Sequence, residues 1–463
     1  MRDGFIKILH FTLSFDGLKM VSEVEPSFYI LRFTFYIKSM LKKILCFILK
    51  LLAQATLWRY RPMIVGVTGS VGKTSTKEVI YAVLKDKYNV RRNIKNYNNE
   101  IGVPLTILGQ ETGGSSSWRW LQIFLVGLFE FFFTKDYPQV LVLEMGADRL
   151  GDIAYLTSFV KCDVGVVTAI GEIPVHVEFF QTADQVAKEK SNILKCLKKD
   201  GWAVLNFDDE RVKMMAHRTQ GKIFSYGFEE KANLRVVNFE QHLENLSEAG
   251  ISFKVDYQGS NVPLRLKNVY AKHQIYSVLA GVAVGLIFKM NLIEITEALK
   301  GYEAPAGRLR LIHGIKDSWI IDDTYNSSPS STLGALELLA LVPGRKIAVI
   351  GDMLELGSFT EEAHRRAGAK AAEVAEIVLA VGERAIFLAD EAKKQGMIKE
   401  KVFHFASAEE AGRLLQDLME EGDVILVKGS QGIRMEKVVK EIMAQPEKAG
   451  ELLVRQDKSW DKK

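Results

Sequence analysis

The stretch Met63 to Glu78, MIVGVTGSVGKTSTKE, runs from apolar residues into a glycine-rich turn and then a Lys-Thr pair. Glycines let backbone N–H groups point inward at phosphate oxygens, and the helix that follows presents its N-terminus to the anion. A lysine at this point can reach the β- and γ-phosphates, and the hydroxyl after it can ligate Mg²⁺. We therefore predict a nucleoside triphosphate site made by Gly69, Ser70, Gly72, Lys73, Thr74 and Ser75.

The glycine spacing departs from the usual P-loop, GxxxxGK[ST]. That pattern needs a glycine where this chain has Val67, and the glycines fall instead at Gly66, Gly69 and Gly72. The physical argument still holds at this spacing, because the glycine turn still leaves backbone N–H groups available to phosphate and a helix still begins directly after it. The spacing disfavours an ordinary P-loop kinase or motor.

Strands must position this turn, and the body of the chain alternates short apolar runs with helical segments. MIVGV, QVLVLEMG, VGVVTAIG and WAVLNFDD come first, and WIIDDT, KIAVIGDM, IVLAVGE and VILVKGS come later. Such runs indicate parallel sheets buried on both faces. We predict an α/β protein with a central doubly wound sheet of the P-loop ATPase type and a C-terminal Rossmann-like α/β domain. Tyr226 to Leu266 alternates instead, which predicts small antiparallel strands attached to the first domain.

The predicted domains are residues 1–61, 62–305 and 306–463, with a boundary in EAPAGRL, Glu303 to Leu309. The 463 residues include three cysteines, none in a CxxC pair, which argues against a disulfide framework or a zinc site. Nucleic acid is not among the expected partners.

Residues 1–61 carry the positive charge of the chain, with ten Lys and Arg against four Asp and Glu. Lys38 to Arg61 holds six basic residues and no acid among apolar ones, and its longest uncharged run, Leu51 to Trp58, is too short to span a bilayer. A basic amphipathic helix here either lies on an anionic membrane surface or packs on the protein's own core. No cleaved signal peptide is evident, and Met20 or Met40 is a candidate start.

Further motifs follow the cradle in a fixed order: NYNNEIGVPLTIL, VLEMGADRLGDIAYL, IGEIPVHVEFFQTADQVAKEKSNIL, LNFDDERV, KHQIYSVLAG, GRLRLI, IDDTYNSSPSS, IGDMLELG and VKGSQGIRMEKVV. Together with the cradle, this series resembles the Mur ligases from about Pro62 to Val439. Folylpolyglutamate synthetases share the cradle, but DDTYNSSP and GDMLELG are similar to the D-alanyl-D-alanine-adding branch of the family.

The resemblance implies an ATP-dependent ligase that joins a carboxylate to an amine through an acyl phosphate. It implies ATP and two Mg²⁺ ions as cofactors, with Thr74, Glu144, His176 and Lys188 at the metals. In the family a lysine is carbamylated by CO₂, and the AKEK spacing is interpreted here as placing it at Lys188 rather than Lys190. The expected catalytic residues are Lys73, His176, Lys188 and Arg308.

The resemblance also implies the residues that hold the nucleotide and the other substrates. Arg308 would reach the γ-phosphate, and Gln274 stands where the family often has asparagine. The expected nucleotide contacts are Asn99, His273, Gln274, Arg308 and Asp323. The expected substrate contacts are Asp322, Tyr325, Asn326, Lys428, Ser430 and Glu436, the first three in a loop that should face the cleft.

The front of the chain departs from that branch, which usually carries an N-terminal domain for the UDP-sugar, whereas about sixty residues precede the cradle here. A second apolar block, Trp118 to Phe133, either packs against the N-terminal helix as core or forms an interfacial patch with it.

We expect a monomeric cytoplasmic enzyme that adds D-Ala-D-Ala to a UDP-muramoyl tripeptide, either free in the cytoplasm or peripheral at the inner face of the membrane. The alternatives are the same chemistry on another or a lipid-linked substrate, or a membrane-associated ATP-binding scaffold without turnover.

Overall fold

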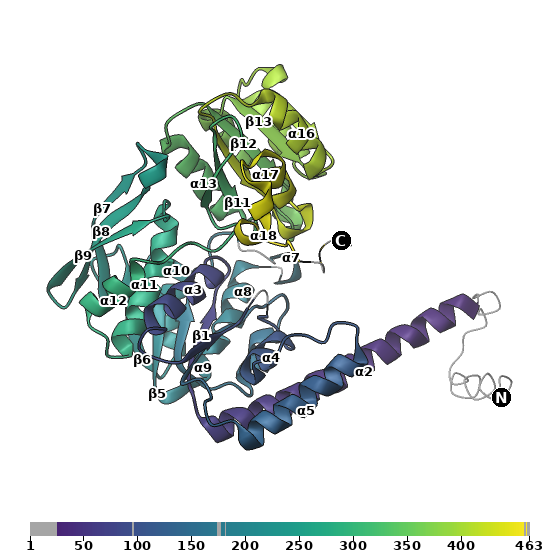
Figure 1. Cartoon of the computed structure of the whole chain (residues 1–463), viewed down its shortest axis with the longest axis vertical. Helices are drawn as coiled ribbons and strands as arrows, with labels where there is room; N and C mark the ends of the chain where they lie inside the picture. Colours follow the sequence, from purple (N-terminus) through teal and green to yellow (C-terminus); the bar gives the residue numbers. More distant parts are fainter. Residues whose placement is uncertain (1–25, 95–96, 174–176, 181, 458–459, 461–463) are drawn as a thin grey trace. The chain divides into compact units, whose positions relative to one another are not determined.

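The computed structural model describes residues 26–94, 97–173, 177–180, 182–457 and 460, and side chains from residue 40 onward. The chain divides into two compact units, Met1–Leu51 and Leu52–Lys463. The second unit contains both sheets and all the site residues considered below (Figure 1).

The first sheet has nine strands in the order β2-β3-β1-β4-β5-β6-β7-β8-β9. Its strands β1 to β6 pair in parallel, and β7, β8 and β9 continue it as an antiparallel ribbon, as the alternating segment predicts. The strands are β1 Met63–Thr68, β2 Val90–Arg92, β3 Val140–Glu144, β4 Cys162–Val167, β5 Leu197–Asn206, β6 Lys222–Gly227, β7 Leu234–His242, β8 Gly250–Tyr257 and β9 Ser260–Lys267.

Helices cover this sheet because their apolar side chains repeat at helical spacing. Helix α3 (Lys73–Leu84) buries Val79, Ile80, Val83 and Leu84 under the sheet and packs against α11 (Lys272–Ile287). The other helices of this domain are α4 Gly102–Leu108, α5 Ser117–Phe133, α6 Asp152–Thr157, α7 Val177–Phe180, α8 Ala183–Lys190, α9 Asn192–Lys195, α10 Glu210–Met214 and α12 Leu292–Leu299.

The second sheet has six strands in the order β10-β11-β15-β12-β13-β14, and only β10 is antiparallel to its neighbour. Its strands are β10 Arg310–His313, β11 Trp319–Asp323, β12 Lys346–Gly351, β13 Ile377–Val381, β14 Val402–Phe405 and β15 Val424–Lys428. Its helices are α13 Pro329–Leu341, α14 Thr360–Val374, α15 Ile386–Lys394, α16 Ala408–Leu418, α17 Glu436–Ile442 and α18 Ala449–Leu452 (Figure 1).

The predicted fold class is confirmed, since every quoted apolar run lies on a strand of one of these two sheets. The short strands β2, β10 and β14 were not predicted, because runs of three or four residues carry no clear period. The predicted boundary at 305–306 falls between the end of α12 and the start of β10.

The basic N-terminal segment is helical, as predicted: α2 runs from Pro26 to Tyr60. Within the described residues, no helix is long and apolar enough to cross a membrane. Helix α5 forms over the predicted apolar block, but only Ile123 and Gly127 are buried in it. The interpretation of this block as core is therefore wrong for most of its side chains.

Candidate active site

The cradle is a tight connection between β1 and α3 that only glycine can make at two points. Gly69 has φ 149°, and a Cβ there would lie 1.9 Å from Thr168 Oγ1. Gly72 has φ 84° and directly precedes α3. The loop is held to the end of β4, since Ser70 N donates to Ala169 O at 2.6 Å and Thr168 Oγ1 donates to Val71 O at 2.6 Å. The backbone of the predicted phosphate loop is thus fixed by its own neighbours.

Lys73 lies inside this loop. Its Nζ donates to Gly69 O at 2.9 Å and lies 3.4 Å from Ser70 O. Burial lowers the pKa of Lys73, with Arg308 adding to that effect, while Glu144 and Asp148 oppose it. A cation held in a site that disfavours it gains most from an anionic ligand.

Glu144 ends β3 directly beside the cradle, because β3 pairs with β1 and brings Glu144 opposite Val67. Its Oε1 accepts from Asn98 Nδ2 at 3.2 Å and from Thr74 Oγ1 at 3.4 Å, and Lys77 Nζ lies 3.5 Å from Oε2. Burial alone would raise the pKa of this carboxyl, but the nearby cations and the Asn98 amide bring it below its ordinary value. Glu144 is therefore held as a carboxylate.

These donors fit a magnesium ion that is shared with phosphate. A carboxylate and a hydroxyl are the oxygen ligands that Mg²⁺ takes, with water and phosphate completing its shell. Within the described residues, no three His, Cys, Asp or Glu side chains gather as a metal cage. His176, the expected further ligand, lies outside the described residues.

The lysine expected to be carbamylated, Lys188, is exposed on helix α8, whereas Lys190, two residues later, is 1% exposed. Burial lowers the pKa of Lys190 to about 7, and Lys73 lowers it further against Asp148 and Glu189. The Nζ of Lys190 has no hydrogen-bond partner among the described residues. Two residues along a helix turn a side chain to the other face, so Lys188 and Lys190 lie in different surroundings.

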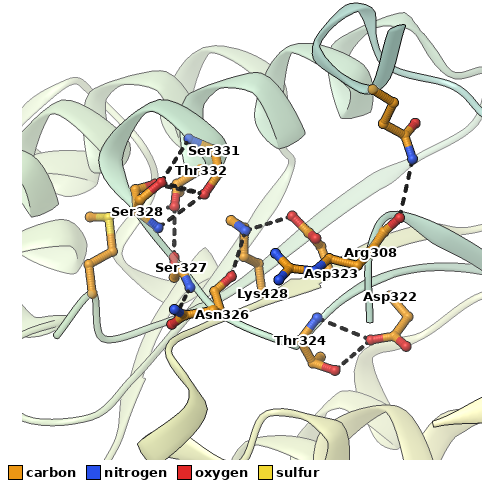
Figure 2. A network of polar contacts seen from close by, with 12 residues as sticks. Arg308, Asp322, Asp323, Thr324, Asn326, Ser327, Ser328, Ser331, Thr332 and Lys428 are labelled. Carbon is orange, nitrogen blue, oxygen red and sulfur yellow. Dashed lines mark hydrogen bonds and ion pairs between the residues drawn. The ribbon is translucent and has the colours of Figure 1, made fainter. Parts of the chain in front are cut away.

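Arg308 reaches the cradle from the segment that connects the two domains. Its Nη2 lies 3.5 Å from Thr74 Oγ1, and its guanidinium lies over the Tyr325 ring at 4.0 Å from the centroid. Gln274 Nε2 donates to the Arg308 carbonyl at 3.2 Å (Figure 2). The position suits contact with a transferring phosphoryl group.

The expected nucleotide contacts on the central domain are one imidazole and two amides, and the amides already bond within the protein. His273 is half-buried, and burial lowers its pKa to about 4, so its imidazole is neutral near pH 7. Gln274 Oε1 accepts from Tyr270 N at 2.8 Å and Ala271 N at 3.0 Å, so this amide already caps α11 and holds Arg308. Asn99 Oδ1 accepts from Gly102 N at 2.9 Å at the start of α4, while its neighbour Asn98 contacts Glu144.

The loop after β11 is a dense polar network (Figure 2). Asp323 and Lys428 are register neighbours on β11 and β15, and their side chains pair at 2.6 Å while nearly fully buried. Lys428 Nζ also donates to Asn326 O at 3.0 Å. Ser328 caps α13, with Pro329 in its first turn. The network fixes the backbone of Asn326 relative to the sheet.

Two expected substrate residues turn away from the cleft. Asp322 is fully buried, and its carboxylate accepts from Gly307 N at 3.1 Å and from Thr324 Oγ1 at 2.6 Å. Glu436 is fully buried and pairs with Arg434 and Arg455. Both carboxylates hold neighbouring loops, and the expectation that Asp322 faces the cleft is wrong. Ser430 lines the cleft, but its Oγ accepts from Leu354 N at 2.9 Å.

Two cavities meet at the cradle. One of about 700 Å³ is lined by Lys73, Thr74 and Glu144 from the central domain and by Tyr325 and Ser430 from the C-terminal domain. The other, of about 570 Å³, is lined by residues that include Ser75, His273, Gln274, Asp323 and Lys428. Gly72 and Arg308 belong to both walls.

Several residues of the site were not predicted from the sequence. Lys77 and Asn98 contact Glu144, and Arg434 and Trp460 line the larger cavity. Lys77 follows Lys73 by four residues and so lies on the same face of α3, which is a signal that helical spacing provides. The others come together only through the fold.

Family models match most of the described chain. The Mur ligase middle domain matches residues 67–117 and 126–285, and the Mur ligase glutamate ligase domain matches residues 307–431. The UDP-N-acetylmuramoyl-tripeptide–D-alanyl-D-alanine ligase of Bacillus subtilis (strain 168) is 30% identical over 401 residues, which are 86% of this chain and 79% of that protein. The enzyme of the same name from Escherichia coli (strain K12) is 29% identical over 382 residues, which are 81% of this chain and 76% of that protein.

Solved structures give the same result. The MurF ligase from Thermotoga maritima in complex with ADP superposes with a TM-score of 0.70 at 26% identity, covering 86% of this chain and 84% of that one. MurF from Acinetobacter baumannii superposes with a TM-score of 0.71 at 25% identity, covering 84% and 79%. With its cradle, its strand-end glutamate and its two α/β domains in the same order, this chain belongs to the Mur ligase family.

Proposed function

We propose that this chain is an ATP-dependent ligase that adds D-Ala-D-Ala to a UDP-N-acetylmuramoyl tripeptide in peptidoglycan precursor synthesis. The observation that carries the proposal is the meeting of two cavities at Gly72 and Arg308. One cavity offers a neutral imidazole and a mostly apolar wall, which suits a nucleoside, and the other is polar and spans both domains. Relatives named for this reaction support the choice of substrates.

The reaction joins a carboxylate to an amine in two steps. A carboxylate oxygen of the tripeptide attacks the γ-phosphorus of ATP, the bond to the β-phosphate oxygen breaks, and ADP leaves with an acyl phosphate formed. The amine of D-Ala-D-Ala then attacks the acyl carbon, phosphate departs with its oxygen, and the amine loses a proton. Catalysis is mostly positioning and charge stabilisation, because three anionic groups must be held together.

In the proposal, the residues of the cradle bind the phosphates of ATP. Backbone N–H groups of Gly69 to Thr74 and the Lys73 ammonium hold the β- and γ-phosphates, and Arg308 neutralises the charge that moves with the phosphoryl group. Mg²⁺ supplies charge neutralisation between the phosphates, with Thr74 and Glu144 as its protein ligands and His176 as a further candidate.

We also propose that Lys190, in place of Lys188, is the lysine that CO₂ modifies. The neutral Nζ attacks the carbon of CO₂ and releases one proton, which turns a buried amine into a carbamate anion. A pKa lowered to about 7 leaves much of this amine neutral at cellular pH. The anion removes the repulsion between Lys190 and Lys73 and adds oxygen ligands near the metal site.

In the proposal, residues of the C-terminal domain contact the substrates. Tyr325, Asn326 and Ser430 line the polar cavity, and Lys428 with Asp323 lines the nucleoside cavity. Because the cradle lies on the central domain and these residues lie on the C-terminal domain, closure of one domain on the other would complete the site. We further propose that the enzyme acts as a monomer in the cytoplasm, at the inner face of the membrane, where ATP and UDP-linked precursors are found.

The test is ADP release by the purified full chain with ATP, Mg²⁺ and UDP-N-acetylmuramoyl tripeptide, with and without D-Ala-D-Ala. Turnover that requires both substrates and yields the pentapeptide product is the expected result. Tight ATP binding without stimulation by either substrate contradicts the substrate assignment, and the search then moves to lipid-linked carboxylates. Absence of turnover with any acceptor would leave only an ATP-binding scaffold.

A further inference from the structure

Helix α5 turns an apolar face outward. Its exposed apolar side chains are Trp118, Leu121, Leu125, Val126, Leu128, Phe129, Phe132 and Phe133, each between 40% and 68% exposed. At 3.6 residues per turn these positions fall within one arc of roughly 160° of the helix circumference, interrupted only by Gln122. We call this arc the aromatic face (α5 is labelled in Figure 1).

The aromatic face is held in place rather than frayed. Ser116 caps the start of α5 by accepting from Arg119 N at 3.3 Å. At the other end, Tyr60 Oη donates to Glu130 O at 2.7 Å and to Thr134 O at 3.0 Å, and Arg59 donates to Phe132 O at 3.2 Å. The helix therefore presents its apolar side chains from a fixed backbone, with Ile123 and Gly127 on the buried side.

Such a face requires an occupant, because contiguous exposed apolar surface on a monomeric protein marks an interaction site. The charges around it indicate which one. The aromatic face contains no charge, Arg119 lies exposed at its edge, and the segments 59–61 and 134–136 at its end carry Arg59, Arg61 and Lys135 against Asp136. The carboxylate of α5 itself, Glu130, is half-buried beside Gln110.

Aromatic and aliphatic side chains on one face with cations at its margin are the pattern of a helix that lies in the membrane interface. Anionic headgroups attract the basic margin while the aromatic rings enter the boundary between headgroups and acyl chains. A second copy of the chain would bring like charges together at the same margin. The N-terminal unit shows the same composition by itself, since Met40, Ile44, Phe47 and Leu51 are exposed on a helix with several lysines and no acid from Lys38 onward.

We propose that the aromatic face of α5 is a docking surface for an anionic lipid bilayer, on which α5 lies parallel to the surface without crossing it. The ATP cradle is then carried at the membrane surface. The docking itself needs neither ATP nor a substrate, so its test is independent of the ligase activity.

The experiment is sedimentation of the full chain with vesicles of phosphatidylcholine alone or with added phosphatidylglycerol. The variant Trp118→Ser/Leu125→Ser/Phe129→Ser removes the centre of the aromatic face. A matched control, Ile293→Ser/Leu341→Ser/Ile398→Ser, removes three apolar side chains that are 57–68% exposed elsewhere on the same unit. A third variant, Arg119→Gln/Lys135→Gln, removes charge only.

We expect the wild-type chain and the matched control to bind the phosphatidylglycerol vesicles alike, and the aromatic-face variant to bind about tenfold more weakly or worse. The charge variant should lose affinity for anionic vesicles and show a smaller response to salt. ADP release with soluble substrates and the melting temperature should stay at wild-type values in all three variants, which excludes misfolding.

Three results would overturn the proposal. One is that the wild-type chain ignores both kinds of vesicle. Another is that the aromatic-face variant binds as tightly as the control, which would assign any membrane contact to residues before Leu52. The last is a concentration-dependent dimer that the aromatic-face variant abolishes, which would identify a second copy as the occupant.

Discussion

The ATP cradle and the loop after β11 are both polar, but they satisfy their polar groups in different ways. Among the described residues, five buried side-chain atoms have no hydrogen-bond partner. Four of them lie at or near the cradle, namely Ser70 Oγ, Thr76 Oγ1, Lys190 Nζ and Arg308 Nε, and the fifth is Tyr226 Oη on β6. In the loop after β11 and on the ends of β11 and β15 beside it, by contrast, the polar side chains are bonded within the protein; these are Asp322, Asp323, Ser327, Ser328 and Lys428 (Figure 2).

This difference indicates which region binds a ligand and which region supports the binding site. An unsatisfied buried polar group costs free energy, so a cluster of them is retained where a ligand compensates. A fully bonded network costs little and fixes a backbone. The cradle thus resembles a binding site, and the loop after β11 resembles a frame for Asn326 and Tyr325. Substitutions in the two regions should differ accordingly.

The largest effect is expected for Lys73→Ala in the cradle. Removing the cation that faces the phosphates should lower ATP-dependent turnover by about a thousandfold or more. Stability should not fall, because burial and Arg308 already disfavour the charge that is removed. ADP release and thermal melting measure the two quantities. Lys85→Ala, at the exposed end of α3, is the control and should leave both unchanged.

A comparable substitution in the loop after β11 should act on stability instead. Lys428→Met leaves the Asp323 carboxylate buried without its partner, and such a loss costs about 3 kcal/mol. Lower melting temperature is the expected result, while Lys401→Met on the exposed surface should melt as the wild type does.

The double variant Asp323→Leu/Lys428→Met sharpens the comparison. Replacing both members of a buried pair by apolar side chains is often close to neutral, so most of the lost stability should return. If the double variant melts as low as Lys428→Met, the frame depends on more than this pair, and the contrast between the two regions weakens.

The sequence was sufficient for what depends on local pattern. The β1 strand, the glycine turn and α3 follow from one stretch. Glu144 was expected from the family resemblance, and the pairing of β1 with β3 places it beside the cradle. Burial was harder to predict. Asp322 and Asp323 are adjacent, yet one holds Gly307 and the other pairs with Lys428 from another strand.

The same difficulty in predicting burial applies to the lysines of α8 and to the apolar side chains of α5. Lys188 and Lys190 are equal in type and differ only in which face of α8 meets the cradle, which a motif cannot report. The apolar block at Trp118–Phe133 was expected either to pack as core or to form an interfacial patch, and the sequence could not decide between them. Periodicity gives no sign of which side is covered when nearly every position is apolar.

The two lysines of α8 provide the next test. Lys190→Met should lower turnover by about a hundredfold, because the proposed carbamate anion beside the metal site is lost. Lys188→Met changes an exposed side chain on the same helix and should have no effect. ¹³C NMR of the wild-type chain with ¹³C-bicarbonate should show a carbamate carbon that is absent from Lys190→Met and present in Lys188→Met.

Loss only in Lys188→Met would return the proposal to Lys188, and equal activity in both variants would contradict a carbamylated lysine at either position. Activity lost in Lys190→Met without any carbamate signal in the wild type would make Lys190 a positioning residue that acts as an amine. Either result would still leave the cradle as the region that depends on a ligand.

The smallest effect is expected from Asp322, which tests whether the frame is as fully satisfied as its bonds suggest. Burial raises the pKa of this carboxyl from 3.8 to about 6, against its hydrogen bonds from Thr324 and Gly307. Between these pH values the folded chain retains a proton that the unfolded chain has released, so this group's contribution to stability falls as pH rises through about 4 to 6.

Asp322→Asn cannot titrate, and the stability of the wild type relative to it should drop by about 2 kcal/mol across that window. Melting temperatures from pH 4 to pH 7.5 measure the change, and the exposed Asp417→Asn should give a curve parallel to the wild type. If Asp322→Asn also runs parallel, the three donors around Asp322 hold it ionised throughout, and the frame stabilises its buried charge better than burial alone predicts.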